Sequence, residues 1–246
     1  MTNDNIFNDS LYPDQQEALK QLTSFLKDPN INVFIISASS MSGKSYLIPY
    51  ITKLAQQFKF SNTVLFVPTA RIANNIQYDF LIEDEIHSLY STIYDWDNIT
   101  EIQNIDKTKD DSQKPKSIAY YIPVKRCNYT AKTLFIVDEA HLVNDSNPYI
   151  ILNTCVGSGY LLKDFIEFSN IKESDNKIVF LGNPYIINIG KKECTALNAD
   201  HLKNQYKCKV SSCSLKNKFD CNDIIKQTQP IIASIEKGVF NSLHFS

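Results

Sequence analysis

Residues 33–45 read VFIISASSMSGKS, and this stretch decides the fold class. It begins with an apolar, largely β-branched run that is typical of a buried strand, and it ends in Gly43, Lys44 and Ser45. Small residues let backbone N–H groups close around phosphate groups, while a Lys supplies positive charge and a Ser hydroxyl can bind Mg²⁺. The stretch therefore predicts a strand, a phosphate-binding loop and a helix over residues 46–58 whose N-terminus points at the anion.

The loop departs from the pattern G-x-x-x-x-G-K-[ST] at its first position, where Ala38 stands in place of Gly. Ala is tolerated there if the backbone has a negative φ, and it strains the loop if φ is positive. The alternative interpretation is a chance Gly-Lys-Ser at a helix start. The residues predicted to bind the nucleotide are Ala38, Ser39, Ser40, Met41, Ser42, Gly43, Lys44, Ser45 and Tyr46.

The bulk composition bounds the class of protein. The chain has 246 residues, of which 43% are hydrophobic, so it can bury one substantial core and we expect a single domain over residues 1–246. The formal net charge of −2 excludes a global basic field that draws the chain to nucleic acid, although it leaves room for a local groove. No apolar run has the length of a membrane span, so we expect a soluble, cytoplasmic protein with no membrane partner.

The cysteines carry no recognisable metal motif. There are six, and none forms a C-x-x-C pair. The nearest approach to metal spacing is His201 with Cys208, Cys213 and Cys221, and its gaps match neither a zinc knuckle nor a zinc ribbon. We therefore expect reduced, partly buried thiols.

Alternation of strand and helix patterns predicts a parallel sheet. An amphipathic helix over residues 11–28 precedes the loop strand, and a strand over 63–68 is followed by a helix over 69–81. Two further apolar strands are expected at 133–137 and 177–181. Parallel strands joined by right-handed helical crossovers give an α/β fold of the P-loop NTPase type, with helices on both faces.

A long excursion over residues 84–132 separates the second and third strands and predicts a small insertion. Its polar middle, residues 97–117, is expected to form an exposed loop, and residues 118–124 a short strand leading into the core. Its aromatic residues could stack on nucleic-acid bases, but we expect them to pack in the interior because no basic residues are interleaved with them. They are Trp96, Tyr120 and Tyr121.

A second motif follows the strand predicted at 133–137, where Asp138 and Glu139 stand next to each other. A Mg²⁺-dependent NTPase needs such a pair opposite its phosphate loop, one acid to hold the metal ion and one to activate the attacking water. The alternative is a solvated strand end. We predict Ser45 and Asp138 as metal ligands, and Lys44 and Glu139 as catalytic residues.

Further short segments occur in a fixed order along the chain: LYPDQ at 11–15, PTAR at 68–71, IHSL at 86–89, DEAH at 138–141, GSGYLL at 157–162 and FLGNP at 180–184. Together with the phosphate loop, they resemble the motifs of the first RecA-like domain of a superfamily 1 helicase, in the RecD-like and Schlafen-related group. The resemblance covers nearly all of the chain. It implies a RecA-like sheet, with ATP and Mg²⁺ as cofactors.

The resemblance also assigns roles to single residues. It implies that Gln15, in the segment similar to the Q motif, contacts adenine. It further implies that Thr69 and Arg71, in the segment similar to motif Ia, and His87, in the segment similar to motif Ib, contact single-stranded nucleic acid. His87 could equally be a core or capping histidine.

Four departures from the family motifs weaken the expected turnover. The segment similar to motif III has Asn183 where the family has Asp, and Ile186 where it has a Gln that senses the γ-phosphate. Asp220 stands where motif IV carries an Arg. Met41 also replaces a family glycine in the loop. An Ile cannot hydrogen-bond, and a carboxylate repels a triphosphate.

These observations support one leading hypothesis and two alternatives. The leading hypothesis is an ATP-binding, Mg²⁺-dependent NTPase domain of helicase type that acts on or with nucleic acid and hydrolyses ATP weakly alone. We expect residues 1–246 to lack the second RecA-like lobe, which carries an arginine finger, so that another lobe or a protein partner completes the cleft. The alternatives are an N-terminal fragment of a full DNA helicase and a degenerate binding module without turnover.

Overall fold

The computed structural model describes residues 11–40, 42–70, 86–101, 120–129, 132–146, 150–151, 154–186, 191–216 and 234. A six-stranded sheet forms the centre of the molecule, and neighbouring strands run parallel in the order β10-β1-β9-β6-β2-β3. The strands are β1 (Val33–Ala38), β2 (Asn62–Val67), β3 (Ile86–Ser88), β6 (Thr133–Val137), β9 (Lys177–Gly182) and β10 (Val210–Leu215). The predicted α/β fold with a parallel sheet is therefore confirmed.

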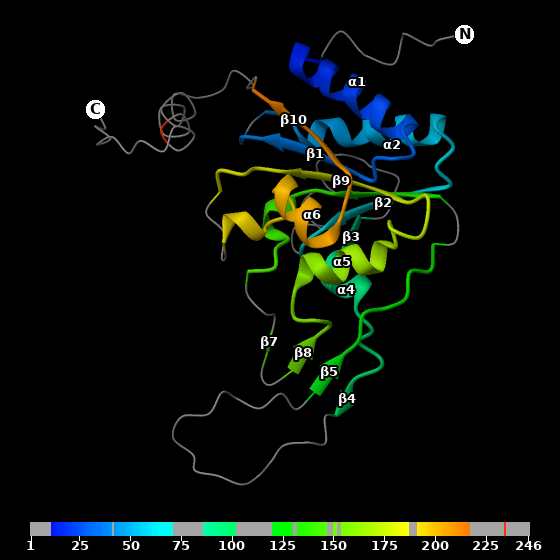
Figure 1. Cartoon of the computed structure of the whole chain (residues 1–246), viewed down its shortest axis with the longest axis vertical. Helices are drawn as coiled ribbons and strands as arrows, with labels where there is room; N and C mark the ends of the chain where they lie inside the picture. The colour runs from blue at the N-terminus through cyan, green and yellow to red at the C-terminus, as the bar shows by residue number, and fades with distance from the viewer. Residues whose placement is uncertain are drawn as a thin grey trace.

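Helices cover both faces of this sheet (Figure 1). On one face lie α1 (Pro13–Lys27) and α2 (Ile48–Gln57), and their apolar residues share a core with one side of the strands. On the other face lie α4 (Leu89–Ile93), α5 (Leu161–Ser169) and α6 (Ala199–Tyr206). The result is a three-layer arrangement in which both faces of the sheet are buried.

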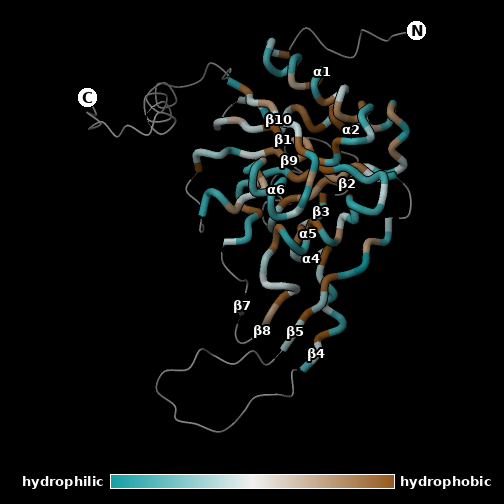
Figure 2. Tube along the Cα trace, in the orientation of Figure 1, coloured by the Kyte–Doolittle hydropathy of each residue, from teal (hydrophilic) through white to brown (hydrophobic). Residues whose placement is uncertain are grey.

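The central strands contribute to both cores because successive side chains point to opposite faces. Within β1, Val33 and Ile35 join the core under α5, whereas Phe34 and Ile36 join the core under α1 and α2. Figure 2 shows hydrophobic residues concentrated in this central region. Burial on both faces explains why these strands read as continuous apolar runs in the sequence.

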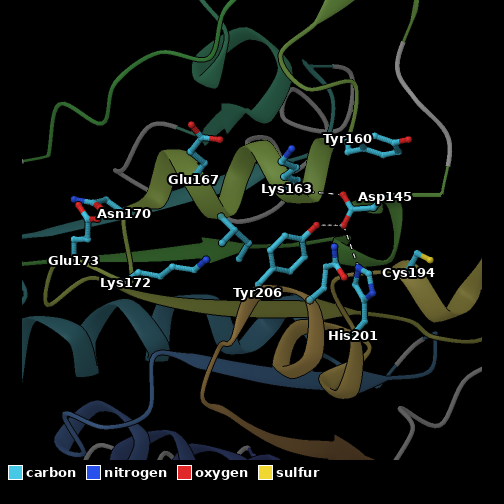
Figure 3. A pocket seen from close by; sticks show the side chains of 12 residues that line it. Asp145, Tyr160, Lys163, Glu167, Asn170, Lys172, Glu173, Cys194, His201 and Tyr206 are labelled. Atoms are coloured by element: carbon cyan, nitrogen blue, oxygen red, sulfur yellow. Dashed lines mark hydrogen bonds and ion pairs between the residues drawn. The ribbon is translucent and has the colours of Figure 1, made fainter.

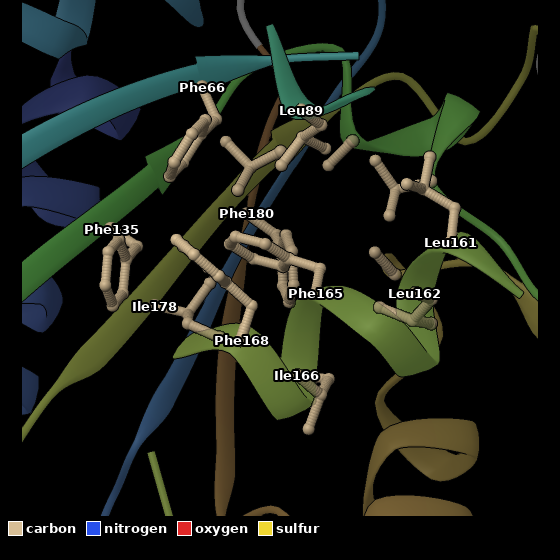
Figure 4. Packing of buried hydrophobic residues seen from close by; sticks show 14 of the residues in the cluster. Phe66, Leu89, Phe135, Leu161, Leu162, Phe165, Ile166, Phe168, Ile178 and Phe180 are labelled. Atoms are coloured by element: carbon tan, nitrogen blue, oxygen red, sulfur yellow. The ribbon is translucent and has the colours of Figure 1, made fainter. Parts of the chain in front are cut away.

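Phenylalanine rings fill the core between α5 and the sheet (Figure 4). The ring of Phe165, on α5, lies 5.7 Å from that of Phe66, 6.2 Å from that of Phe135 and 6.1 Å from that of Phe180. These three partners lie on β2, β6 and β9, and all four rings are fully buried. Each buried ring contributes about 1.5–3 kcal/mol of transfer free energy, so this cluster fixes α5 on the sheet.

The predicted helix over 46–58 begins differently from expectation. Its first turn is a 3₁₀ turn, Ser45–Leu47, and the α-helix α2 starts only at Ile48. Pro49 lies in the first turn of α2, where backbone N–H groups make no hydrogen bond within the helix, so the lack of an N–H in proline costs nothing there. The helix predicted at 69–81 lies almost wholly outside the described residues.

The insertion contributes two strands to a second, four-stranded sheet with the order β4-β5-β8-β7, whose other two strands follow β6, and this sheet extends away from the central sheet (Figure 1). Its strands are β4 (Thr100–Glu101), β5 (Tyr120–Ile122), β7 (Ile150–Ile151) and β8 (Thr154–Val156). The strand predicted at 118–124 is confirmed as β5, and its last residue, Ile122, is buried in the core under α5, although β5 pairs within this second sheet and not with the central one. Most of the loop predicted at 97–117 lies outside the described residues.

The prediction that the aromatic residues of the insertion pack in the interior is wrong for two of them. Trp96 is 41% exposed and Tyr120 is 45% exposed. The indole N–H of Trp96 donates to the backbone carbonyl of Tyr90 at 2.8 Å. Tyr120 begins β5 beside β4, whose two residues are exposed, so its ring stays at the surface. Within the described ranges, every helix is too short or too polar to cross a bilayer.

Candidate nucleotide site

The phosphate loop and the acid pair meet at one edge of the central sheet. The loop follows β1 and the acids follow β6, with β9 lying between these two strands. All strands of a parallel sheet end at the same edge, so the side chains that follow them converge there. This edge carries Lys44, Ser45, Asp138 and Glu139.

Direct contacts join the two segments. Lys44 Nζ donates to Asp138 Oδ1 at 3.1 Å and also to Glu139 Oε1. Ser45 Oγ donates to Asp138 Oδ2 at 2.6 Å. The Asp138 side chain is fully buried, and its partners supply the hydrogen bonds that a buried carboxylate requires. Removing one partner of a buried ion pair typically costs about 3–5 kcal/mol, so the two segments hold each other in place.

Opposing effects set the proton affinity of Lys44. Burial lowers the pKa of its ammonium, and the charges of Asp138 and Glu139 raise it by more, so the net pKa is above the ordinary value. Lys44 therefore carries its positive charge throughout the physiological pH range. The Ser45 hydroxyl and the Asp138 carboxylate are both hard oxygen ligands, the kind that Mg²⁺ prefers, and they lie side by side.

The acid pair has an unusual backbone. Glu139 adopts the left-handed conformation with φ of 52°, and its N–H donates to Asp138 Oδ1 at 2.8 Å. This turn directs the Glu139 carboxylate toward both Lys44 and His141, whose Nδ1 lies 3.3 Å from Glu139 Oε2. Left-handed backbone costs a non-glycine residue about 1–2 kcal/mol and is common where a site must orient a side chain.

His141 connects the acid pair to the end of β9. Its ring is buried, and burial lowers the pKa of the imidazole, with Lys44 acting in the same direction. Its Nδ1 lies 3.5 Å from the backbone N–H of Asn183. Gly182 permits this approach, because a Cβ there would stand 3.0 Å from the backbone nitrogen of His141 and 2.8 Å from Leu197 Cδ1.

The phosphate loop is closed by its own hydrogen bond and by one glycine. Ser42 Oγ donates to the carbonyl of Ser39 at 2.8 Å, and Gly43 has φ of 73°, a conformation that favours glycine. Ala38 is the last residue of β1, in extended backbone, so Ala in place of the first Gly causes no strain. Met41 lies outside the described residues. Tyr46 lies in the turn after the loop and is 39% exposed.

Asn183, the residue that follows β9, contacts the phosphate loop. Its Nδ2 donates to Ser40 Oγ at 3.0 Å, and its Oδ1 accepts from the backbone N–H of Tyr185 at 2.9 Å. An amide here can both donate and accept, which explains how Asn serves at a position where the family resemblance expects Asp. Ile186 is 43% exposed, and Asp220 lies outside the described residues.

Gln15 joins α1 to the phosphate loop. Its Nε2 donates to the carbonyl of Ser42 at 3.1 Å, and its Oε1 accepts from the backbone N–H of Tyr12 at 2.9 Å. The side chain is buried, with 1% exposed. These bonds give Gln15 a place beside the loop, and its contact with adenine remains a prediction.

Two of the residues predicted to contact nucleic acid belong to neighbouring strands or the residues just after them. Thr69 is exposed just beyond β2, and His87 lies in β3 with its ring centroid 5.9 Å from that of Phe66. Because β2 and β3 are paired with His87 opposite Phe66, the two predicted residues lie on or just beyond neighbouring strands. Arg71 lies outside the described residues, and the nucleic-acid contacts remain predictions.

The GSGYLL segment forms the turn into α5. The residue that holds this turn, Asp164, was not predicted from the sequence. Asp164, fully buried in the first turn of α5, accepts from the backbone N–H of Ser158 at 3.0 Å and from the Tyr94 hydroxyl at 2.8 Å. Gly157 has φ of 56°, and a Cβ there would stand 2.1 Å from Asp164 Oδ2. Burial raises the pKa of the Asp164 carboxyl. An acidic residue in the first helical turn is the one sequence signal for this role.

A second polar cluster lies between α5 and α6, beside a cavity of about 930 Å³ (Figure 3). Asp145 accepts from the backbone N–H of Lys163 at 3.0 Å, contacts His201 Nε2 at 3.1 Å and accepts from the Tyr206 hydroxyl. Burial and Asp145 raise the pKa of the Tyr206 phenol. Asp145 thus ties the segment that follows the acid pair to both helices. Among described residues, no three His, Cys, Asp or Glu side chains are placed to hold a metal ion.

Comparison with known proteins adds one finding. A family model described as "Type III restriction enzyme, res subunit" matches residues 8–182, more than half of the chain. The matched range contains the phosphate loop and the acid pair, and it ends with β9. No curated protein matches the chain.

Proposed function

Because the chain belongs to the family described as type III restriction enzyme, res subunit, which comprises helicase-type P-loop domains, we propose that it is a Mg²⁺-dependent ATPase. The contact of Lys44 and Ser45 with Asp138 and Glu139 carries this proposal. Four residues with complementary roles in phosphoryl transfer come from two segments, and the contacting residues are 93 to 95 positions apart in the sequence. A solvated strand end does not require such an arrangement.

The proposed roles follow from the side chains. Lys44 and the loop amides hold the β- and γ-phosphates, Ser45 and Asp138 hold Mg²⁺, and Glu139 orients and deprotonates the attacking water. When bound, Mg²⁺ supplies charge neutralisation at the phosphate oxygens. Gln15 is proposed to contact adenine from its position beside the loop.

The bond between Lys44 and Glu139 gives this mechanism an order of events. While the ammonium of Lys44 binds both acids, the Glu139 carboxylate is engaged and cannot serve as a base. A triphosphate in the loop attracts the ammonium away from Glu139, which frees the carboxylate for water. Binding and activation of the base are thereby linked.

Turnover is expected to be slow. Ile186 provides no hydrogen bond to a γ-phosphate or a water, and the arginine finger that speeds related NTPases by about 10³–10⁵ would come from a second RecA-like lobe or a protein partner. We further propose membership in the RecD-like and Schlafen-related group, from the GSGYLL segment. The nucleic-acid ligand is proposed to be single-stranded, contacted by Thr69, Arg71 and His87.

A second candidate is a binding module without turnover, which Asn183 and Ile186 favour. Steady-state phosphate release with and without single-stranded DNA separates the two. Glu139→Gln keeps an oxygen for Lys44 but removes the base, so ATPase activity should fall by about 10² or more while the melting temperature stays close to that of the wild type. Glu173→Gln, at an exposed site, is the matched control. Absence of turnover at high protein concentration would favour the binding module.

A further inference from the structure

A cavity lined with lysines lies at the opposite edge of the central sheet from the phosphate loop. Its volume is about 600 Å³, within the range of ligand pockets. Its walls come from the segments that lead into β1, β6, β9 and β10, so it lies at the N-terminal ends of these strands. The lysines that line it are Lys27, Lys132, Lys172, Lys177, Lys207 and Lys209.

The charge of this cavity is opposite to that of the chain. Six lysines line it against one carboxylate, that of Asp175, whereas the whole chain has a formal net charge of −2. Among the residues that the structure describes, no carboxylate lies within 4 Å of any of these six ammonium groups. Unpaired like charges around one hollow repel one another, so their concentration there is unfavourable unless an anion joins them.

One of the lysines has a structural role, and the others keep their charge available. Lys177 is buried and donates to three backbone carbonyls. Lys132 lies over the ring of Phe60, and Lys207 donates to the carbonyl of Asn204. Neither contact neutralises the ammonium. Lys172 and Lys209 are exposed at the rim.

We propose that this lysine cavity binds phosphate groups of a polyanion, at a site separate from the nucleotide loop. Several ammonium groups around one hollow suit a ligand with several closely spaced negative charges, and Lys binds phosphate as a point charge without demanding a planar partner. The phosphates can come from a nucleic-acid backbone or from a free polyphosphate. The two sources share this chemistry, and the experiment separates them.

The test compares two triple variants that change the net charge equally. Lys132→Gln, Lys172→Gln and Lys209→Gln together remove the cavity charge but leave the structural Lys177 in place. Lys20→Gln, Lys53→Gln and Lys203→Gln, all at exposed positions away from the cavity, form the control. Both are made in a Lys44→Ala background, which weakens binding of tripolyphosphate at the phosphate loop, and matching melting curves establish that both fold.

Inorganic tripolyphosphate is titrated by calorimetry, and a labelled single-stranded DNA by fluorescence anisotropy. We expect the cavity variant to bind tripolyphosphate at least about tenfold more weakly than the control, a difference of about 1.4 kcal/mol. If a DNA backbone is the source, DNA binding weakens as well, and three lost phosphate contacts reduce the slope of log K against log salt by about 2. If only tripolyphosphate binding weakens, a free polyphosphate is the source. Equal binding of both probes by the two variants would overturn the proposal.

Discussion

Replacing Lys177 with Met tests how the buried ammonium at the start of β9 stabilises the fold. Lys177 Nζ donates to the carbonyls of Phe25 at 2.8 Å and Ile31 at 2.7 Å, and also to that of Asp28. The Phe25 carbonyl needs this donor because Pro29, four residues further along, has no N–H to offer. A cation at the C-terminus of α1 also complements the helix dipole.

The size of the effect follows from these contacts. Met keeps most of the aliphatic stem, so the change removes the donors with little loss of packing. In the variant the Asp28 carbonyl still accepts from the N–H of Ile31 at 3.4 Å. The carbonyls of Phe25 and Ile31 lose the donor that Lys177 provides. At about 1–3 kcal/mol for each of the two unsatisfied carbonyls, plus about 1 kcal/mol for the ammonium over the Phe25 ring, the loss is about 3–7 kcal/mol.

Thermal and urea unfolding measure this loss. For a chain of this size, at about 2–4 °C per kcal/mol, the melting temperature should fall by about 6–28 °C. Lys209→Met, at the exposed rim of the same cavity, is the matched control and should change the stability by no more than about 0.5 kcal/mol. If Lys177→Met unfolds within 1 kcal/mol of the wild type, the carbonyl contacts contribute little and the reasoning is refuted.

Three further predictions concern stability and the loop. Burial, and then the charge of Lys132, lower the pKa of Lys177 to about 8, below the value of 10.5 in the unfolded chain. Between these two pH values the unfolded chain binds the proton more tightly, so raising the pH should stabilise the wild type relative to Lys177→Met. A stability difference in urea unfolding that stays constant from pH 8 to pH 10.5 would contradict this. Gly157→Ala should destabilise the chain by about 3 kcal/mol or more in urea unfolding, because its Cβ would meet Asp164 Oδ2, and a change below 1 kcal/mol would count against the contact. Ala38→Gly should leave the affinity for an ATP analogue within about twofold, because Ala38 ends a strand in extended backbone, and a large gain in affinity would show that Ala strains the loop.

The strands at the centre of the fold were predictable because their sequence pattern reflects their environment. β1, β6 and β9 are buried on both faces and therefore read as uninterrupted apolar runs. β10 has the sequence VSSCSL and lies at the edge of the sheet, so it lacks that pattern. β3 has only three residues, too few to show a period.

The candidate site was predictable where its motif is local and not where it depends on distant contacts. Lys44, Ser45, Asp138 and Glu139 stand in short segments with a known chemical logic. Asp145 was missed because the residues that make it important are its partners on α5 and α6, up to 61 positions away. For Lys177 the sequence predicted only the start of a strand. Its structural role could not be predicted, because its carbonyl acceptors lie 146 to 152 residues earlier in the chain.

The fluorescence titration of an ATP analogue, with and without Mg²⁺, tests the central claim most directly. The wild type should bind the analogue saturably and more tightly with Mg²⁺, and Lys44→Ala should weaken binding by at least about tenfold, while Lys53→Ala, an exposed lysine on α2, should bind as the wild type does. Circular dichroism establishes that both variants fold. Absence of saturable binding by the wild type, or equal binding by Lys44→Ala, would contradict the assignment of this edge of the sheet as a nucleotide site.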